Sequence, residues 1–238
     1  MIHQTWLDEV SLISLDRPER RNALDRPMLD QLAQALGRAA DRRARVVVLT
    51  GSSGAFCAGA DLTEFEDEGF MAALMAVLQG LTEFPACTIA AIDGPALGAG
   101  AQLAVACDLR VATEASLLGI PAARLGVVID VWTVRRLVAL AGGATARDML
   151  LTAHALSGGD AQRLGLVQRM GDLAAALKWA DEIAQLAPLS IAGHKIALEQ
   201  LDDTADVRAA REAAWTSTDI TEGRAAFLEK RPPRFTGK

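Results

Sequence analysis

The sequence contains no tyrosine and only three histidines, His3, His154 and His194. Two side-chain types that often transfer protons in enzymes are therefore absent or scarce. Carboxylates are abundant by comparison, with 30 aspartate and glutamate residues. Proton transfer, if the protein performs any, is predicted to depend on carboxylates. The histidines show no metal-ligand spacing, so no metal site is predicted.

Cysteine is also scarce, with Cys57, Cys87 and Cys107 in the whole chain. Their odd number and the lack of a C-x-x-C pair predict neither a disulfide framework nor a zinc site, and a reducing compartment follows. The N-terminus has no basic segment followed by an apolar run, and no stretch of about 18 apolar residues occurs. These absences predict a cytoplasmic protein without a membrane span.

An excess of basic residues is lacking as well. The chain carries 24 lysine and arginine residues against 30 acidic ones, for a formal net charge of −6. This balance argues against nucleic acid as a partner. With 51% hydrophobic and 23% charged residues over 238 positions, the composition is that of an ordinary globular protein.

Short apolar runs rich in β-branched residues alternate with stretches of helical periodicity in the first half of the chain, whereas helical patterns dominate the second half. This order predicts an α/β core over residues 1–187 and a helical region over 188–238. No linker rich in glycine, serine or proline separates the two. The predicted strands are 10–15, 45–50, 88–92 and 109–112.

Small residues follow two of these strands in a similar pattern. Ala-Gly-Ala occurs at 58–60 and again at 99–101, so that residues 56–61 align with residues 97–102. Small residues let another group approach the backbone, and the first N–H groups of a helix are unpaired within it. Two such amides can form an oxyanion hole. Close packing of helix on strand is the alternative explanation.

Four motifs resemble the enoyl-CoA hydratase/isomerase, or crotonase, superfamily. The resemblance covers nearly the whole chain and implies an α/β crotonase (ClpP/crotonase) fold: a spiral of ββα units with a helical C-terminal region that forms trimers. The motifs are Arg-Pro-Glu-Arg-Arg-Asn-Ala-Leu (17–24), Phe-Cys-Ala-Gly-Ala-Asp-Leu (56–62), Asp-Gly-Pro-Ala-Leu-Gly-Ala-Gly-Ala-Gln-Leu (93–103) with Cys-Asp-Leu-Arg (107–110), and Phe-Leu-Glu-Lys-Arg-Pro-Pro (227–233).

The resemblance also implies a ligand and its contacts. The ligand is a coenzyme A thioester, no further cofactor is expected, and the two oxyanion amides are predicted at Ala58 and Ala99. Alanine stands at 99 where the family usually has glycine, which leaves the N–H available unless the turn requires a positive φ. The family's CoA contacts map to Arg21, Ala23, Ala60 and Asp61.

The chain departs from the family at the positions of the hydratase acid and base. Gln102 and Ala122 stand where hydratases of the family carry two glutamates that place and activate water. A carboxamide has no useful basicity near neutral pH, and a methyl group has none. Each acid or base catalyst typically contributes about 10²–10⁴-fold. Hydration is therefore predicted to be absent or very weak.

Asp130 stands where dienoyl-CoA isomerases and acyl-CoA dehalogenases of the superfamily carry a working aspartate. The resemblance implies a base, a nucleophile or a polar clamp, while its place before a helix is equally typical of an N-cap. Trp132 is predicted either to line the acyl pocket or to be an ordinary core residue.

Residues 62–84 correspond to the family's most variable region, which walls the acyl pocket. Phe65, Phe70, Leu74 and Leu78 are candidates for contacts with a lipid tail. A plain amphipathic helix packed on the core is the alternative.

Three functions remain open on the sequence alone. The first is a fatty acyl-CoA-binding protein of lipid metabolism that holds or transfers its ligand without hydrating it. The second is an active superfamily enzyme, an isomerase, thioesterase or weak hydratase, that uses Asp130. The third is a structural or interaction trimer with a degenerate pocket. In each case a homotrimer or a dimer of trimers is expected from the resemblance.

Overall fold

The computed structural model describes all residues except 63–67 and 201. A six-stranded sheet, with strand order β1-β2-β3-β4-β6-β9, forms its centre. β1 pairs antiparallel with β2, and every other neighbouring pair is parallel. The four predicted strands are confirmed, whereas β1 and β9 were not predicted. The bounds are β1 (Ile2–Leu7), β2 (Val10–Leu15), β3 (Val46–Gly51), β4 (Cys87–Ile92), β6 (Leu109–Ala112) and β9 (Arg169–Met170).

A small second sheet has the strand order β5-β7-β8. Its strands are β5 (Pro95–Leu97), β7 (Leu117–Gly119) and β8 (Ala155–Ser157). β5 pairs parallel with β7, and β8 closes the sheet in the antiparallel direction. Each strand has three residues, which is too short for a period of two to stand out in the sequence.

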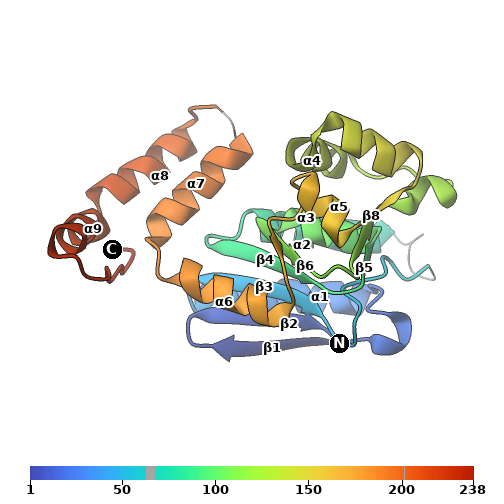
Figure 1. The fold of residues 1–238 in the computed structure, drawn as a ribbon, viewed down its shortest axis with the longest axis horizontal. Helices are drawn as coiled ribbons and strands as arrows, with labels where there is room; N and C mark the ends of the chain where they lie inside the picture. The colour runs from blue at the N-terminus through green and yellow to red at the C-terminus, as the bar shows by residue number, and fades with distance from the viewer. Residues whose placement is uncertain (63–67, 201) are drawn as a thin grey trace.

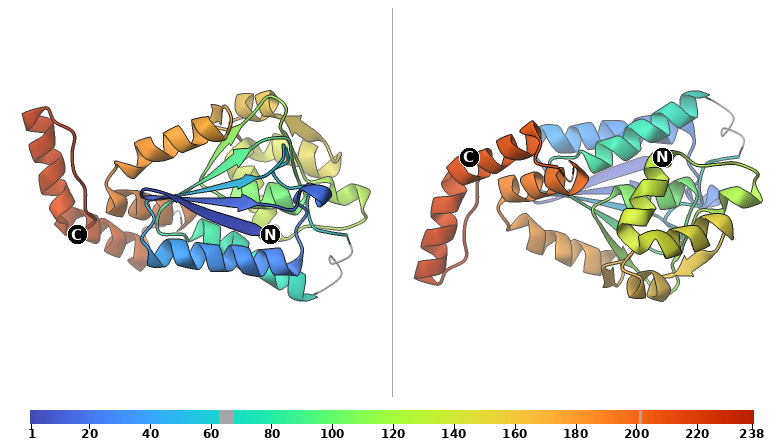
Figure 2. Two further views of the ribbon diagram at one scale, coloured as in Figure 1. Left: turned by 90° about the horizontal axis from the view of Figure 1, so that it is seen from below. Right: turned by 90° about the horizontal axis from the view of Figure 1, so that it is seen from above.

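Helices cover both faces of the large sheet, and α1 and α6 lie on opposite sides of it (Figure 2). Alternation along the strands determines which residues face which side: Val47 and Leu49 join the cluster that contains α1, α2 and α3, while Val46 and Val48 pack with α6. The bounds are α1 (Arg26–Asp41), α2 (Glu68–Thr82), α3 (Ala99–Ala106) and α6 (Leu173–Ala184).

The remaining helices lie beyond the sheet. Gly142, with φ 80° and ψ 157°, interrupts α4 and divides it into two helical segments. The last three helices extend to one side of the core (Figure 1). The bounds are α4 (Val131–Leu151), α5 (Gly158–Arg163), α7 (Pro188–Gln200), α8 (Ala205–Thr216) and α9 (Thr218–Glu229), with short 3-10 turns at Pro18–Arg20 and Pro121–Arg124.

A buried lysine attaches α7 to the core. The Lys195 ammonium donates to Asp108 Oδ2 at 2.8 Å and to the carbonyl oxygens of Leu81 and Ala86 at 3.0 and 3.2 Å. These three hydrogen bonds fix α7, the first helix of the C-terminal region, to the core. No helix among the described residues is long and apolar enough to cross a bilayer.

Candidate functional site

The first three motifs lie side by side because their backbones pair like short parallel strands. Leu24 bridges Ala60, and Cys57 bridges Ala96. The Leu24 N–H donates to the Gly59 carbonyl at 2.8 Å, and the Cys57 N–H donates to the Pro95 carbonyl at 2.9 Å. These pairs bring the loops that follow β2, β3 and β4 to one edge of the sheet, where the carboxyl ends of its parallel strands lie.

The backbone amides of Ala60 and of Ala99, the first residue of α3, lie at this edge and have no acceptor among the described residues. At the bridge with Leu24, the hydrogen bonds are made by Gly59 and Asp61, so the Ala60 N–H points to the other side. Ala99 begins a helix, where the N–H group has no intrahelical partner. Both amides are free to donate to a ligand.

The prediction that the Ala58 amide is a free donor is wrong. Its N–H already donates to the Arg21 carbonyl oxygen at 3.0 Å. Ala58 holds the first motif in place instead, and Ala60 supplies the free amide.

The error arises from the register of the internal repeat. Alignment of the two Ala-Gly-Ala triplets matches Ala58 with Ala99, whereas the bridge between Cys57 and Ala96 shifts the correspondence by two residues. In that register Gly59, with φ 116°, corresponds to Gly98, with φ 53°, and each precedes a free amide. The positive φ is carried by these glycines, and Ala99 is not among the positive-φ residues, so its alanine is accommodated.

The free amides open onto an apolar pocket with a volume of about 480 Å³. This size lies within the range of about 300–1,000 Å³ that is usual for small-molecule sites. Gln102 and Asp130 are the only polar side chains among the described residues that line it. The lining residues are Ala58, Gly59, Ala60, Leu62, Phe70, Met71, Leu74, Gly98, Ala99, Gln102, Ile120, Pro121, Ala122, Leu125, Val127, Val128, Ile129 and Asp130.

The structure thus brings together Gln102 and Ala122 with the two free amides. Gln102 is on α3, one turn after Ala99, and Ala122 is in the 3-10 turn that follows β7. Neither residue can accept or donate a proton in a catalytic step, because a carboxamide and a methyl group lack a titratable group near neutral pH.

Asp130 caps α4, as the N-cap alternative predicted. Its Oδ1 accepts the Thr133 N–H at 2.8 Å, and its Oδ2 accepts the Thr133 hydroxyl at 2.7 Å and Gln102 Nε2 at 2.8 Å. Gln102 Nε2 also donates to Thr133 Oγ1 at 2.8 Å. Thr133 was not predicted as part of the site, although its place three residues after a capping aspartate was a sequence signal for the contact.

Cys57 lies beside the site but is not a nucleophile. The thiol is fully buried, and burial raises its pKa to about 12. The thiolate, which is the reactive form, is therefore not populated near neutral pH.

The Asp61 carboxylate forms an ion pair with Arg17, a residue that was not predicted as part of the site. Arg17 Nη1 lies 2.9 Å from Asp61 Oδ2 and donates to the Ala23 carbonyl at 3.1 Å. Asp61 is only 7% exposed. Arg17 is therefore a positioning residue that ties the first motif to the loop that carries the Ala60 amide.

Replacing Arg17 with Met is expected to loosen this loop and to lower the free energy of unfolding by about 1–3 kcal/mol, because the ion pair with a mostly buried carboxylate and the hydrogen bond to the Ala23 carbonyl are both lost. Hydrogen–deuterium exchange over residues 17–24 and 57–62 should become faster. Arg20→Met, at an exposed arginine of the same turn, is the matched control. Unchanged exchange in the Arg17 variant would contradict the positioning role.

The remaining predicted residues are divided between the pocket lining and other parts of the molecule. Arg21 is exposed with φ 50°, and the Ala23 carbonyl is engaged by Arg17; their CoA contacts stay predictions. Trp132 packs against the core and lines a neighbouring cavity of about 360 Å³ between α2 and α7, which corresponds to its core alternative. Phe70 and Leu74 line the pocket, Leu78 is buried in the core, and Phe65 lies outside the described residues.

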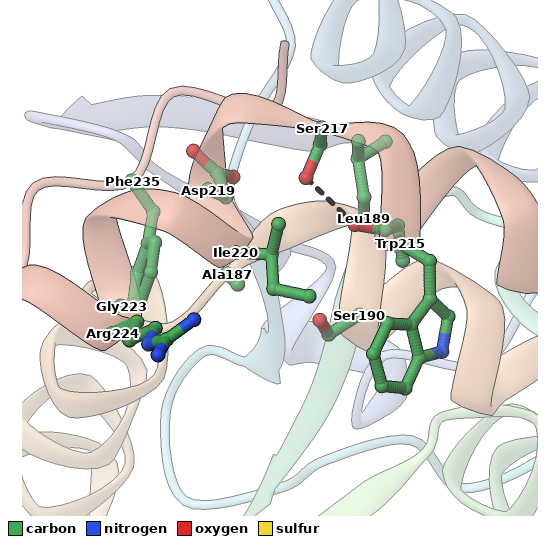
Figure 3. Close-up of a pocket in the computed structure, with 11 residues that line it drawn as sticks. Ala187, Leu189, Ser190, Trp215, Ser217, Asp219, Ile220, Gly223, Arg224 and Phe235 are labelled. Atoms are coloured by element: carbon green, nitrogen blue, oxygen red, sulfur yellow. Dashed lines mark hydrogen bonds between the residues drawn. The ribbon is translucent and has the colours of Figure 1, made fainter.

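A cavity of similar size, about 500 Å³, lies among the C-terminal helices (Figure 3). Its wall combines Trp215, Ile220 and Phe235 with the polar residues Ser190, Ser217, Asp219 and Arg224. The Ser217 hydroxyl donates to the Ala214 carbonyl at 2.8 Å, and the Asp219 carboxylate accepts the N–H groups of Thr236 and Gly237. This cavity contains no predicted site residue.

The chain is similar to known proteins over its full length. The family model described as enoyl-CoA hydratase/isomerase matches residues 7–238. A Mycobacterium tuberculosis protein named "Probable enoyl-CoA hydratase echA6" is 42% identical over 248 aligned positions, which cover 100% of both chains. The human "Enoyl-CoA hydratase domain-containing protein 2, mitochondrial" is 36% identical, over 96% of this chain and 86% of its own length.

Solved structures agree. An enoyl-CoA hydratase from Bacillus anthracis superposes with a TM-score of 0.90 at 30% identity, over 100% of this chain and 99% of that one. An enoyl-CoA hydratase/carnithine racemase from Magnetospirillum magneticum gives a TM-score of 0.92 at 30% identity, over 100% and 96% of the two chains.

Proposed function

Because the chain belongs to the enoyl-CoA hydratase/isomerase family and has the crotonase fold, we propose that it binds a fatty acyl-CoA thioester without hydrating it. The observation that carries this proposal is one pocket in which two free amides lie together and in which the described residues include no acid–base pair. The Ala60 and Ala99 amides are placed to donate to the thioester carbonyl oxygen, and the apolar wall suits an acyl chain. Holding or transferring the thioester in lipid metabolism is the role this supports.

Calorimetry with palmitoyl-CoA and a turnover assay with crotonyl-CoA test the proposal together. Binding is expected, because the amides and the apolar wall are in place. Turnover is expected to fall short of a family hydratase by at least about 10²-fold, because the proton-transfer groups are missing. Hydration at an ordinary hydratase rate would contradict the proposal. Failure to bind would instead favour the structural trimer.

A second candidate is an active enzyme that uses Asp130, the only titratable side chain among the described pocket residues. Three donors already contact its carboxylate, so at most about one lone-pair site of the usual four remains for a substrate. Asp130→Asn keeps a good N-cap, so the helix should stay intact. If Asp130 is not catalytic, turnover of a panel of enoyl- and acyl-CoAs should not fall in this variant; a loss of at least about 10²-fold would favour the enzyme.

We also propose that the last helices form the contacts of a homotrimer. Large apolar side chains on α7, α8 and α9 are exposed, which is unusual for a monomer's surface when they are this numerous. The exposed residues are Leu198, Trp215, Ile220, Phe227 and Leu228.

Phe227→Glu combined with Leu228→Glu is expected to shift the protein to monomers, because charges would be buried at the interface. Light scattering after size-exclusion chromatography measures the mass. Leu151→Glu, at an equally exposed leucine on α4, is the matched control. An unchanged mass in the double variant would contradict this interface.

The cytoplasmic location of the protein stays a prediction from the sequence.

A further inference from the structure

We propose that Arg136 and Glu199 are positioning residues that orient α3, so that α7 of the C-terminal region affects how tightly the pocket binds a thioester carbonyl. This inference rests on the proposed function, because it assumes that the carbonyl oxygen binds the Ala60 and Ala99 amides. The observation that carries it is a set of charged contacts that join α7 to the C-terminal end of α3.

The helix that carries the Ala99 amide is short. It has eight residues, all of them buried, with the sequence Ala-Gly-Ala-Gln-Leu-Ala-Val-Ala. An isolated helix of this length is not stable in water. Gly98, at its N-cap, has no side chain that could bond to the first amides. The direction of the Ala99 N–H therefore depends in part on the groups that contact the other end of the helix.

Two arginines from outside α3 bind carbonyl groups at its C-terminal end. An α-helix leaves its last four carbonyl groups without intrahelical partners. The Ala104 carbonyl accepts from Arg110 Nη1 at 3.2 Å, and the Val105 carbonyl accepts from Arg136 Nε at 2.9 Å. Arg110 lies on β6, the strand that follows α3, whereas Arg136 lies on α4. Arg136 therefore fixes α3 relative to another helix.

Glu199 on α7 orients the Arg136 guanidinium. Arg136 Nη1 forms an ion pair with Glu199 Oε1 while Nε donates to Val105. The guanidinium is planar, so a carboxylate on Nη1 also fixes the direction of Nε. The Arg136 side chain is 12% exposed and that of Glu199 28%, so salt screens this pair less than a surface pair. Without Glu199, the guanidinium is expected to turn away from Val105 more easily.

A second charged contact joins α7 to the same end of α3. Lys195 comes four residues before Glu199, so the two side chains lie on one face of α7. The Lys195 ammonium donates at 2.8 Å to Asp108 Oδ2, two residues after the last residue of α3. Apolar packing is incomplete here, because Lys195, Glu199 and Trp132 line the cavity of about 360 Å³. The charged contacts are therefore important for the attachment of α7 to this part of the core.

A displacement of α3 would affect the carbonyl of the ligand more than its acyl chain. A hydrogen bond weakens steeply when its distance and angle change, whereas burial of an apolar chain is not directional. Ala60 lies outside α3, so its amide does not move with the helix. Loss of Arg136 or Glu199 is therefore expected to weaken one of the two hydrogen bonds to the carbonyl oxygen.

Titration calorimetry with palmitoyl-CoA and with S-hexadecyl-CoA, a thioether of the same chain length without the carbonyl oxygen, tests the proposal. The native protein is expected to bind the thioester at least about tenfold more tightly, the usual effect of two hydrogen bonds. In Arg136→Met this preference should fall about fivefold, which corresponds to the loss of one hydrogen bond. The affinity for the thioether should change little, because Arg136 does not line the pocket. A merely structural role would lower the stability of the protein without changing the preference.

Glu199→Gln keeps the shape of the side chain and serves as the second variant should Arg136→Met not fold. Its preference for the thioester should also fall, because the guanidinium loses its ion pair. Glu182→Gln, on α6, removes an exposed ion pair with Arg169 and is the matched control. It should keep the native preference.

An unchanged preference in the folded Arg136 and Glu199 variants overturns the proposal while the proposed function stands. Equal binding of the two ligands by the native protein also overturns it, since no contact with the carbonyl would then remain to be positioned. If the native protein binds neither ligand, the proposed function fails as well.

Discussion

Hydration of crotonyl-CoA is expected to increase at least about 10²-fold when Gln102→Glu and Ala122→Glu are combined with Asp130→Asn. An acid and a base each contribute about 10²–10⁴-fold in typical enzymes, and both positions line the pocket beside the free amides. The two new glutamates would supply the acid and the base, and the Ala60 and Ala99 amides would hold the thioester carbonyl beside them.

Asp130→Asn is needed because of the contact that Gln102 makes. Gln102 Nε2 lies 2.8 Å from Asp130 Oδ2. A second carboxylate at this distance would repel the first, and the two would share a proton. An asparagine at this position removes the negative charge, keeps the helix cap and donates a hydrogen bond to the new carboxylate.

A stopped assay of hydrated product compares four proteins: the native chain, each single glutamate substitution in the Asp130→Asn background, and the triple variant. The largest rate is expected for the triple variant. An equally high rate for the native chain would contradict the missing acid–base pair. No gain in a triple variant that still binds palmitoyl-CoA would contradict the placement of the Ala60 and Ala99 amides.

Replacing Arg110 with Met is expected to lower the free energy of unfolding by about 3–5 kcal/mol, the usual cost of removing a buried charged group with several partners. Arg110 is fully buried, and burial lowers its pKa to about 10. Its guanidinium donates to carbonyls of Leu166 at 2.5 Å and Cys107 at 2.8 Å, and to Ala104 and Asp108 at 3.2 Å. Without it, these acceptors are left unpaired in the interior.

Arg110 also affects the site through α3. The helix is buried along its whole length, and its last carbonyls bond to Arg110 while its first amide is the free N–H of Ala99. A cation at the C-terminal end of a helix complements its dipole. Arg110 therefore stabilises the core and also fixes α3, the helix that carries the Ala99 amide and Gln102 of the pocket.

Urea unfolding at one protein concentration measures the change, since oligomers unfold at concentration-dependent midpoints. Arg163→Met is the control, because that side chain is 77% exposed in an ion pair with Asp160, and surface pairs contribute at most about 1 kcal/mol. A loss under about 1 kcal/mol for the Arg110 variant would contradict the account of the buried guanidinium.

The sequence predicted the parts of the fold that depend on long apolar patterns. β2, β3, β4 and β6 are predominantly apolar segments, and each is confirmed as a strand. β1 escaped prediction because its residues alternate between exposed and half-buried, and the strands of the small sheet are only three residues long. Such short elements are defined by contacts with distant segments rather than by local pattern.

For the site, the sequence located the loops but not the atom that donates. Ala58 and Ala60 have the same side chain, and only the pairing with residues 21–24 shows which N–H is occupied. Likewise, Asp130 could be identified as a cap candidate from its position, whereas its contact with Gln102 joins residues 28 positions apart. Arg17 and Trp132 illustrate the same limit, because their partners come from other loops and helices.

The mass of a bound enoyl-CoA tests the central claim most directly. The protein is incubated with trans-2-hexadecenoyl-CoA in ¹⁸O-labelled water and desalted, and the ligand that elutes with the protein is released by denaturant and weighed. Binding without hydration predicts a retained ligand of unchanged mass. A retained ligand heavier by one labelled water molecule would contradict the claim, and so would the absence of any retained ligand.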